Sequence, residues 1–132
     1  MTESSVPPLT QLDRFAALTD AEIQLIADHG TPVTIPANWS LIWEKTPADK
    51  AYIILDGEVS VRIGGQEIAR LGPGDTVGEA AIMAHRLRSA SVVSLTPLKV
   101  LHFTADAVRE LVDAVPTFRI ALEQTTADRL GR

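Results

Sequence analysis

The sequence lacks cysteine: none of its 132 residues is one. Disulfides, thiolate nucleophiles, iron–sulfur clusters and cysteine-ligated zinc are therefore excluded together. No apolar run approaches the ~18 residues that a membrane-spanning helix needs. The first ten residues also lack the basic and apolar segments of a secretion signal. We therefore expect a cytoplasmic protein without membrane insertion.

Positive charge is scarce as well, because 12 Lys and Arg stand against 17 Asp and Glu, for a net charge of −5. This balance does not favour a nucleic acid partner. Any anionic ligand must instead be held by a local basic site. The length fits one domain, and the 45% of hydrophobic residues are enough for a sizeable core.

The N-terminal third predicts an arm followed by helices. Residues 1–8 are polar and end in two prolines, which favour an extended, flexible arm. Helices are expected within residues 9–30. Thr19 and Glu22 have the spacing of a capping box, so a helix is predicted to begin near Asp20. Gly30 is expected to close it in the left-handed conformation.

Residues 31–103 change to an alternating apolar pattern that is interrupted by turn residues about every ten positions, which is typical of a sandwich or barrel. The apolar run Tyr52–Leu55 predicts a buried strand. Gly64 and Gly65 predict a two-residue hairpin between strands. We therefore expect a β-roll over residues 31–103.

Two further helices are expected within residues 104–130. Thr104 can cap the first, and Pro116 suits the first turn of the second. Segregated helices and strands argue against alternating βαβ units. The predicted fold is mainly β: one domain over residues 9–132, an antiparallel jelly-roll-like β-roll flanked by N- and C-terminal α-helices.

The usual signatures of catalysis are missing from the sequence. His29, His85 and His102 are scattered, without a spacing that would aim two imidazoles at one metal. We interpret His102 as a half-buried strand histidine. No nucleophile elbow, Walker or Rossmann pattern is present. A small jelly-roll enzyme would need clustered histidines or carboxylates, so we expect no catalytic residue, no metal site and no cofactor.

One dense group of unusual residues runs from position 71 to 92, LGPGDTVGEAAIMAHRLRSASV. Its small residues would let a ligand approach the main chain. If residues 78–82 open a helical turn, the unpaired N–H groups around Ala80 and Ala81 form an anion site. Arg88 could grip the same anion with its planar fork. Glu79 beside a phosphate suggests a sugar hydroxyl attached to that phosphate, which indicates a nucleotide.

The stretch VGEAAI, a short loop and then LRSASV resemble the phosphate-binding cassette of the cyclic nucleotide-binding domain family, which includes the catabolite activator protein and the regulatory subunits of cyclic-AMP-dependent kinase. Residues 46–49, 51–59 and 71–75 resemble the family's other recurring segments. The likeness covers the chain from about residue 9 to its end.

The resemblance implies a set of ligand-binding residues: Gly78, Glu79, Ala80, Ala81, Arg88, Ser89 and Ser91. In the family's pattern, Arg88 pairs with the exocyclic phosphate oxygens and Glu79 accepts from the ribose 2'-hydroxyl. Main-chain groups and Ser89 complete the phosphate cradle, and Ser91 is the candidate for base selection. The alternatives for these residues are a surface salt bridge for Arg88 and an exposed loop acid for Glu79.

The sequence departs from the family's pattern at three places. Val77 replaces the usual Phe, Leu87 a common Pro, and Lys45 stands where Gly is frequent. None of the three changes removes a group expected to touch the ligand. Arg86 has no family counterpart and is interpreted as a solvated charge. The aromatic residues Tyr52, Trp39 and Trp43 are expected in the β core or at its rim.

We therefore expect a stand-alone cyclic nucleotide-binding sensor or regulatory module. The expected ligand is 3',5'-cyclic AMP, with cyclic GMP as the alternative. The family's terminal helix acts as a lid over the base, and the residues available for it are Phe118, Ala121, Leu122, Thr125 and Thr126. Occupancy would reposition the C-terminal helices toward an effector protein or a second copy of the chain. The alternative is a ligand-free interaction module that kept the fold and signals through its helical surface.

Overall fold

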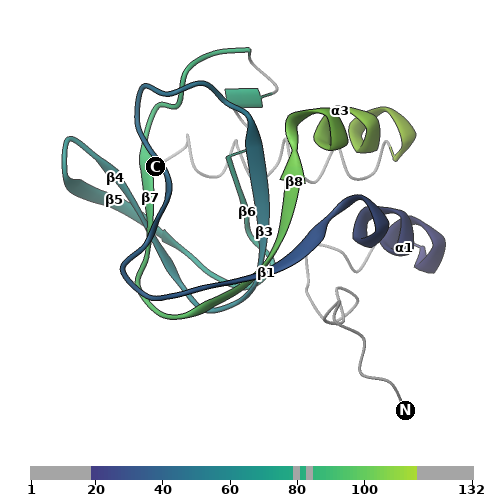
Figure 1. The fold of residues 1–132 in the computed structure, drawn as a ribbon, viewed down its shortest axis with the longest axis horizontal. Helices are drawn as coiled ribbons and strands as arrows, with labels where there is room; N and C mark the ends of the chain where they lie inside the picture. Colours follow the sequence, from purple (N-terminus) through teal and green to yellow (C-terminus); the bar gives the residue numbers. More distant parts are fainter. Residues whose placement is uncertain (1–18, 79–80, 83–84, 116–132) are drawn as a thin grey trace.

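The structure is a computed structural model that describes residues 19–78, 81–82 and 85–115. Within these ranges the chain forms two α-helices and eight strands (Figure 1): α1 (Asp20–His29), β1 (Thr31–Ile35), β2 (Ser40–Ile42), β3 (Lys50–Asp56), β4 (Val59–Ile63), β5 (Gln66–Leu71), β6 (Thr76–Val77), β7 (Ser91–Ser94), β8 (Leu98–Thr104) and α3 (Ala105–Ala114). Neither described helix is long and apolar enough to cross a membrane. The expected arm, the helix before residue 19 and the helix after Pro116, with its five lid residues, lie outside the described residues.

The strands form two four-stranded antiparallel sheets. The first sheet has the order β1-β8-β3-β6, and the second has the order β2-β7-β4-β5. Pro32 lies in β1, at an edge of the first sheet, where a residue without an N–H is tolerated. The predicted antiparallel β-roll with flanking helices is confirmed.

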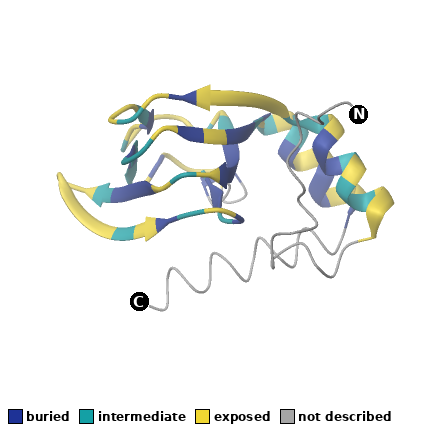
Figure 2. Ribbon diagram, turned by 90° about the horizontal axis from the view of Figure 1, so that it is seen from below, coloured by how far each residue is buried: buried dark blue, intermediate teal, exposed yellow. Residues whose placement is uncertain are grey.

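The first sheet separates two hydrophobic cores. Ala51, Ile53 and Leu55 of β3 pack with residues of α1 and α3, whereas Tyr52 and Ile54 point into the core between the sheets. Because both faces of β3 are covered, its residues form a continuous apolar run rather than an alternating one. In Figure 2 buried stretches occur along strands of the β-roll as well as on α1 and α3.

The capping box of α1 is present as predicted. The Thr19 hydroxyl accepts from the Glu22 N–H at 3.1 Å, and the Thr19 N–H donates to the Glu22 carboxylate at 2.9 Å. Likewise, the Thr104 hydroxyl caps α3 by accepting from the Ala107 N–H at 3.1 Å. These side chains satisfy N–H groups that a helix leaves unpaired at its start.

The expectation for Gly30 is wrong. Its backbone is extended, with φ −103° and ψ 159°, rather than left-handed. The reason for glycine is a close approach, because a Cβ here would lie 2.8 Å from Cζ of Phe103. Gly30 therefore lets the end of α1 lie against the Phe103 ring.

The β4–β5 hairpin turns at Gly64 and Gly65 as predicted, with φ values of 59° and 81°. Its register shifts, however: Val61 pairs with Ala69 and Arg62 pairs with Glu67, which leaves Ile68 as an extra residue. The side chain of Ile68 is 55% exposed. A one-residue bulge of this kind interrupts the simple alternation of a strand.

The two tryptophans do not belong to the core. Trp39 is 58% exposed and Trp43 is 63% exposed. The main chain at Trp39 is held by the fully buried Ser94, whose hydroxyl accepts from the Trp39 N–H at 2.8 Å and donates to the Pro36 carbonyl at 2.7 Å. Tyr52 is buried as expected.

Candidate functional site

The chain enters the predicted cassette at Gly78, directly after β6. Gly78 has a φ of +90°, a conformation that side-chain-bearing residues rarely adopt. A Cβ at this position would lie 2.8 Å from Nη1 of Arg88, 2.8 Å from Cδ1 of Ile42 and 3.0 Å from the carbonyl oxygen of Lys50. Both the backbone conformation and the space therefore require glycine.

The Arg88 side chain is buried beside Gly78, with 5% of the residue exposed. Its Nη1 donates to the Gly78 carbonyl oxygen at 2.5 Å, and its Nη2 donates to the Lys50 carbonyl oxygen. A buried guanidinium needs such partners, because removing a charge from water is costly. The cation is thus held inside the fold, whereas a surface salt bridge would leave it exposed.

The main chain of Arg88 is anchored to the segment before β3. The Arg88 N–H donates to the Thr46 carbonyl at 2.9 Å, and the Arg88 carbonyl accepts from the Lys45 N–H at 2.8 Å. Lys45 has a left-handed φ of 64°. Glycine, which is frequent at this position in the family that the sequence resembles, adopts this conformation without strain. Lysine at position 45 therefore costs stability.

Ser91 is held by the same segment. Its hydroxyl accepts from the Glu44 N–H at 3.0 Å. Ser91 pairs with Arg62, one position from the pair Val92–Val61, whose side chains lie in the core between the sheets. Because side chains alternate along a strand, Ser91 points away from that core. Its role in base selection stays a prediction.

An apolar row starts at Gly78 and crosses the second sheet. Ile42 pairs with Val92, Val92 with Val61, and Val61 with Ala69, so the four side chains share one face across β2, β7, β4 and β5. Ile42, Val61 and Val92 are buried, and Ala69 is partly buried. The buried cation at Arg88 therefore lies at one end of an apolar strip.

The remaining predicted ligand residues are placed as follows. Ala81 is buried and Ser89 is exposed, next to Arg88 in the chain. Glu79 and Ala80 lie outside the described residues. Lys50 was missed by the sequence analysis, and it contributes its main-chain carbonyl to Arg88. Every residue type has this carbonyl, so the identity of residue 50 gives no signal of the contact. Ile42 could have been suspected only from its place in the alternating pattern.

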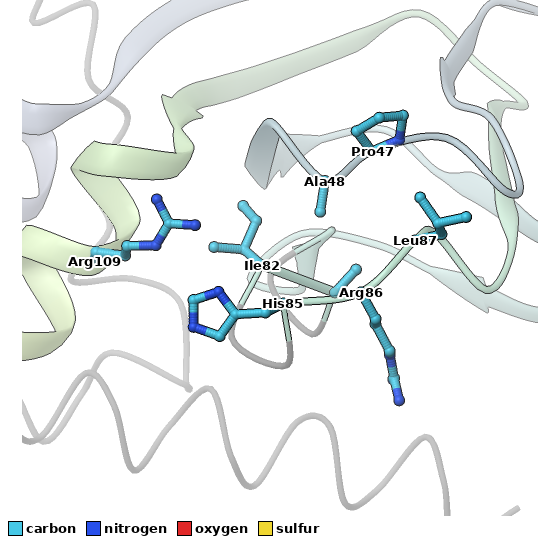
Figure 3. A pocket seen from close by; sticks show the side chains of 8 residues that line it. Pro47, Ala48, Ile82, His85, Arg86, Leu87 and Arg109 are labelled. Carbon is cyan, nitrogen blue, oxygen red and sulfur yellow. The ribbon is translucent and has the colours of Figure 1, made fainter.

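An open cleft of about 350 Å³ lies beside the cradle, lined by Pro47, Ala48, Ala81, Ile82, His85, Arg86, Leu87 and Arg109. In Figure 3 the side chains of His85 and Arg109 stand at one end and Leu87 at the other. Among the predicted ligand residues that the structure describes, only Ala81 lines this cleft. The cleft therefore lies next to the site formed by Gly78 and Arg88 and shares Ala81 with the predicted ligand residues. Arg86 is exposed, as expected.

Two titratable rings face each other near this site. The rings of Tyr52 and His102 meet edge to face, with centroids 5.4 Å apart. Burial raises the pKa of Tyr52, an effect that the positive charge of Arg88 partly offsets. Burial and the neighbouring Lys50 lower the pKa of His102. His102 is half-buried in β8 as predicted, and no group of metal-ligating side chains occurs among the described residues.

The comparisons with known proteins identify a family and a fold. The family model described as "cyclic nucleotide-binding domain" matches residues 32–114. The chain is 33% identical over 106 residues to the Pycsar effector protein PaPycTIR of Pseudomonas aeruginosa, which covers 80% of this chain and 34% of that protein. The chain thus spans about a third of the length of this curated relative.

Solved structures share the architecture. The catabolite activator protein of Thermus thermophilus superposes with a TM-score of 0.77 at 24% identity, covering 89% of this chain and 57% of that one. At this identity the likeness concerns the fold alone. The regulatory domain of Toxoplasma gondii PKA, solved with cAMP, superposes with a TM-score of 0.67 at 26% identity, covering 78% of this chain and 41% of that one.

Proposed function

Because the chain belongs to the cyclic nucleotide-binding domain family, we propose that it binds a 3',5'-cyclic mononucleotide, cyclic AMP in the first place, through Gly78, Arg88 and the cassette between them. The observation that carries this proposal is the buried guanidinium of Arg88, which donates to main-chain carbonyls rather than to solvent. A phosphate offers two oxygens that match this planar fork and would compete for its donors.

The apolar row supports the rest of the ligand's placement. A nucleotide has a charged end and a flat, largely apolar base. The strip Ile42–Val92–Val61–Ala69 begins next to the cation and lines the apolar interior against which the base is proposed to pack. An apolar strip discriminates little between bases, so cyclic GMP is the first competitor of cyclic AMP. The solved regulatory domain of Toxoplasma gondii PKA with cAMP supports trying the adenine nucleotide first.

We propose that the domain is regulatory and non-catalytic, and that occupancy is transmitted through α3. Ile82 of the cassette shares one core with Val108, Leu111 and Val112 of α3. A shift of the cassette around a phosphate therefore changes the surface on which α3 packs. The receiver is proposed to be an effector protein or a second copy of the chain, reached through α3 and the residues that follow it.

Isothermal titration of the purified chain tests the proposal. Cyclic AMP, cyclic GMP, cyclic CMP and cyclic UMP are titrated in parallel, with 5'-AMP as the control for an unconstrained phosphate. Saturable one-to-one binding of a cyclic nucleotide without a response to 5'-AMP would support it. A folded sample that binds none of them would contradict it. Arg88 would then have a structural role that includes tying Gly78 to Lys50, and the domain would act as an interaction module.

A further inference from the structure

Thr76 carries a buried hydroxyl without a hydrogen-bond partner. The residue is 5% exposed, and its Oγ1 forms no hydrogen bond within the part of the chain that the structure describes. Such groups are rare in folded proteins, because burying an unpaired hydroxyl is costly. Valine has nearly the same shape and would avoid that cost. The hydroxyl at this position therefore calls for a physical explanation.

The position of Thr76 suggests one. It lies in β6, the two-residue edge strand that ends immediately before Gly78. Thr76 pairs with Ile53, whose side chain lies in the same core as Ile82 of the cassette. Its neighbour Val77 points to the opposite face, into the core between the sheets. The unpaired hydroxyl is thus on the face of the sheet against which the cassette packs.

We infer that Thr76 is a positioning residue whose hydroxyl acquires a main-chain hydrogen bond from the cassette when a cyclic nucleotide binds. This inference rests on the proposed function. In the free protein the unpaired hydroxyl raises the free energy of the folded state. In the bound protein the new bond removes this cost. The difference between the two states contributes to ligand affinity, since a ligand shifts an equilibrium only by its differential affinity for the two states.

The test compares Thr76→Val, which removes the hydroxyl and keeps the shape, with Thr76→Ser, which keeps the hydroxyl. Kd is measured by titration with the cyclic nucleotide that the unaltered chain binds, and the stability of the ligand-free protein by urea denaturation. Thr34→Val, on the exposed strand β1, is the matched control for the same chemical change.

Thr76→Val is expected to unfold at a higher urea concentration than the unaltered chain while its Kd rises about tenfold, a loss of the size of one buried hydrogen bond. Thr76→Ser and Thr34→Val should keep Kd within about twofold. A purely structural role cannot produce this combination, because it would move stability and affinity in the same direction.

Two results would overturn the inference and leave the proposed function standing. One is a Thr76→Val variant that binds within about twofold of the unaltered chain. The other is a variant less stable than the unaltered chain, since that would mean that the hydroxyl already has a partner in the free protein. If the unaltered chain binds no cyclic nucleotide, the proposed function fails as well and the inference with it.

Discussion

Nη1 of Arg88 lies 2.5 Å from the carbonyl oxygen of Gly78 and 2.8 Å from the place where a Cβ of residue 78 would stand. The guanidinium thus occupies the space that a side chain at residue 78 would need. These two residues, ten positions apart in the chain, form one unit. The orientation of the cation depends on the absence of a side chain at Gly78.

Gly78→Ala should therefore disturb both stability and binding. The added methyl meets the Arg88 guanidinium and the Lys50 carbonyl, and alanine at a φ of +90° is strained. We expect a loss of at least ~1 kcal/mol in the free energy of unfolding, together with loss of nucleotide binding, measured by urea denaturation and titration.

Gly65→Ala is the matched control for Gly78→Ala. Its φ is also positive, 81°, but no atom lies within 4 Å of the added Cβ. This variant should show the backbone strain and keep the Kd of the unaltered chain. Equal affinities for both variants would mean that the space beside Arg88 has no role in binding.

Arg88→Ala should remove one or two charge-assisted hydrogen bonds to the phosphate. At ~1.5 to 3 kcal/mol each, this loss weakens binding by roughly ten- to several-hundred-fold. Arg88→Lys keeps the charge but not the planar fork, so it should restore only part of the affinity. Titration with the preferred cyclic nucleotide measures both, after circular dichroism has shown that each variant is folded. Unchanged affinity in Arg88→Ala would refute the phosphate role.

Lys45→Gly should stabilise the protein. Lys45 adopts a left-handed φ of 64°, which costs a side-chain-bearing residue ~1 to 2 kcal/mol. Glycine removes this strain but loses more backbone entropy on folding. The expected net gain is about 0.5 to 1 kcal/mol in the free energy of unfolding, measured by urea denaturation. A less stable variant would show that the Lys45 side chain forms contacts that outweigh the strain.

Gly30→Ala tests the close approach between the end of α1 and the Phe103 ring. The methyl would lie 2.8 Å and 2.9 Å from two ring atoms of Phe103, so an overpacking cost of ~1 to 3 kcal/mol is expected in thermal or urea denaturation. Phe103→Leu shortens the opposing ring. In a double-mutant cycle, the double variant should lose less free energy of unfolding than the two single variants lose together. Additive losses would contradict a contact between the two positions.

His102 should give the folded state a specific pH dependence. Burial and then Lys50 lower its pKa in the folded protein, so the unfolded chain binds a proton more readily. Stability is therefore retained above the ordinary histidine pKa of about 6.5 and declines as pH falls through that value toward the folded pKa. As the pH is lowered from 8 to 5, the urea midpoint should decline less in His102→Gln than in the unaltered chain. Parallel pH curves for both proteins would argue against this origin.

Local signals in the sequence predicted the elements they encode. The Thr19–Glu22 spacing and the Gly64–Gly65 pair act within a few residues, and both features appear in the structure. The membership of Gly78 and Arg88 in one cassette could also be anticipated, because the resemblance to a known family supplied it. In each case the deciding contact is short in sequence or belongs to a recognisable motif.

The features that sequence reasoning missed depend on contacts between distant parts of the chain. Gly30 is set by Phe103, and the exposure of Trp39 follows from a turn held by Ser94, 55 positions away. The exposure of Ile68 follows from a register shift between two strands. Neither the partner of a residue nor a bulge is visible in an alternating pattern, which reports only the average period of a strand.

The proline in β1 has a consequence for self-association. An edge strand can recruit a strand from another molecule, and such pairing starts aggregation. β1 is an edge of the first sheet and carries Pro32. A strand arriving at that edge meets an interrupted set of donors and cannot form a continuous ladder. Pro32 therefore protects the molecule against edge-to-edge stacking at the end of the sheet next to α1.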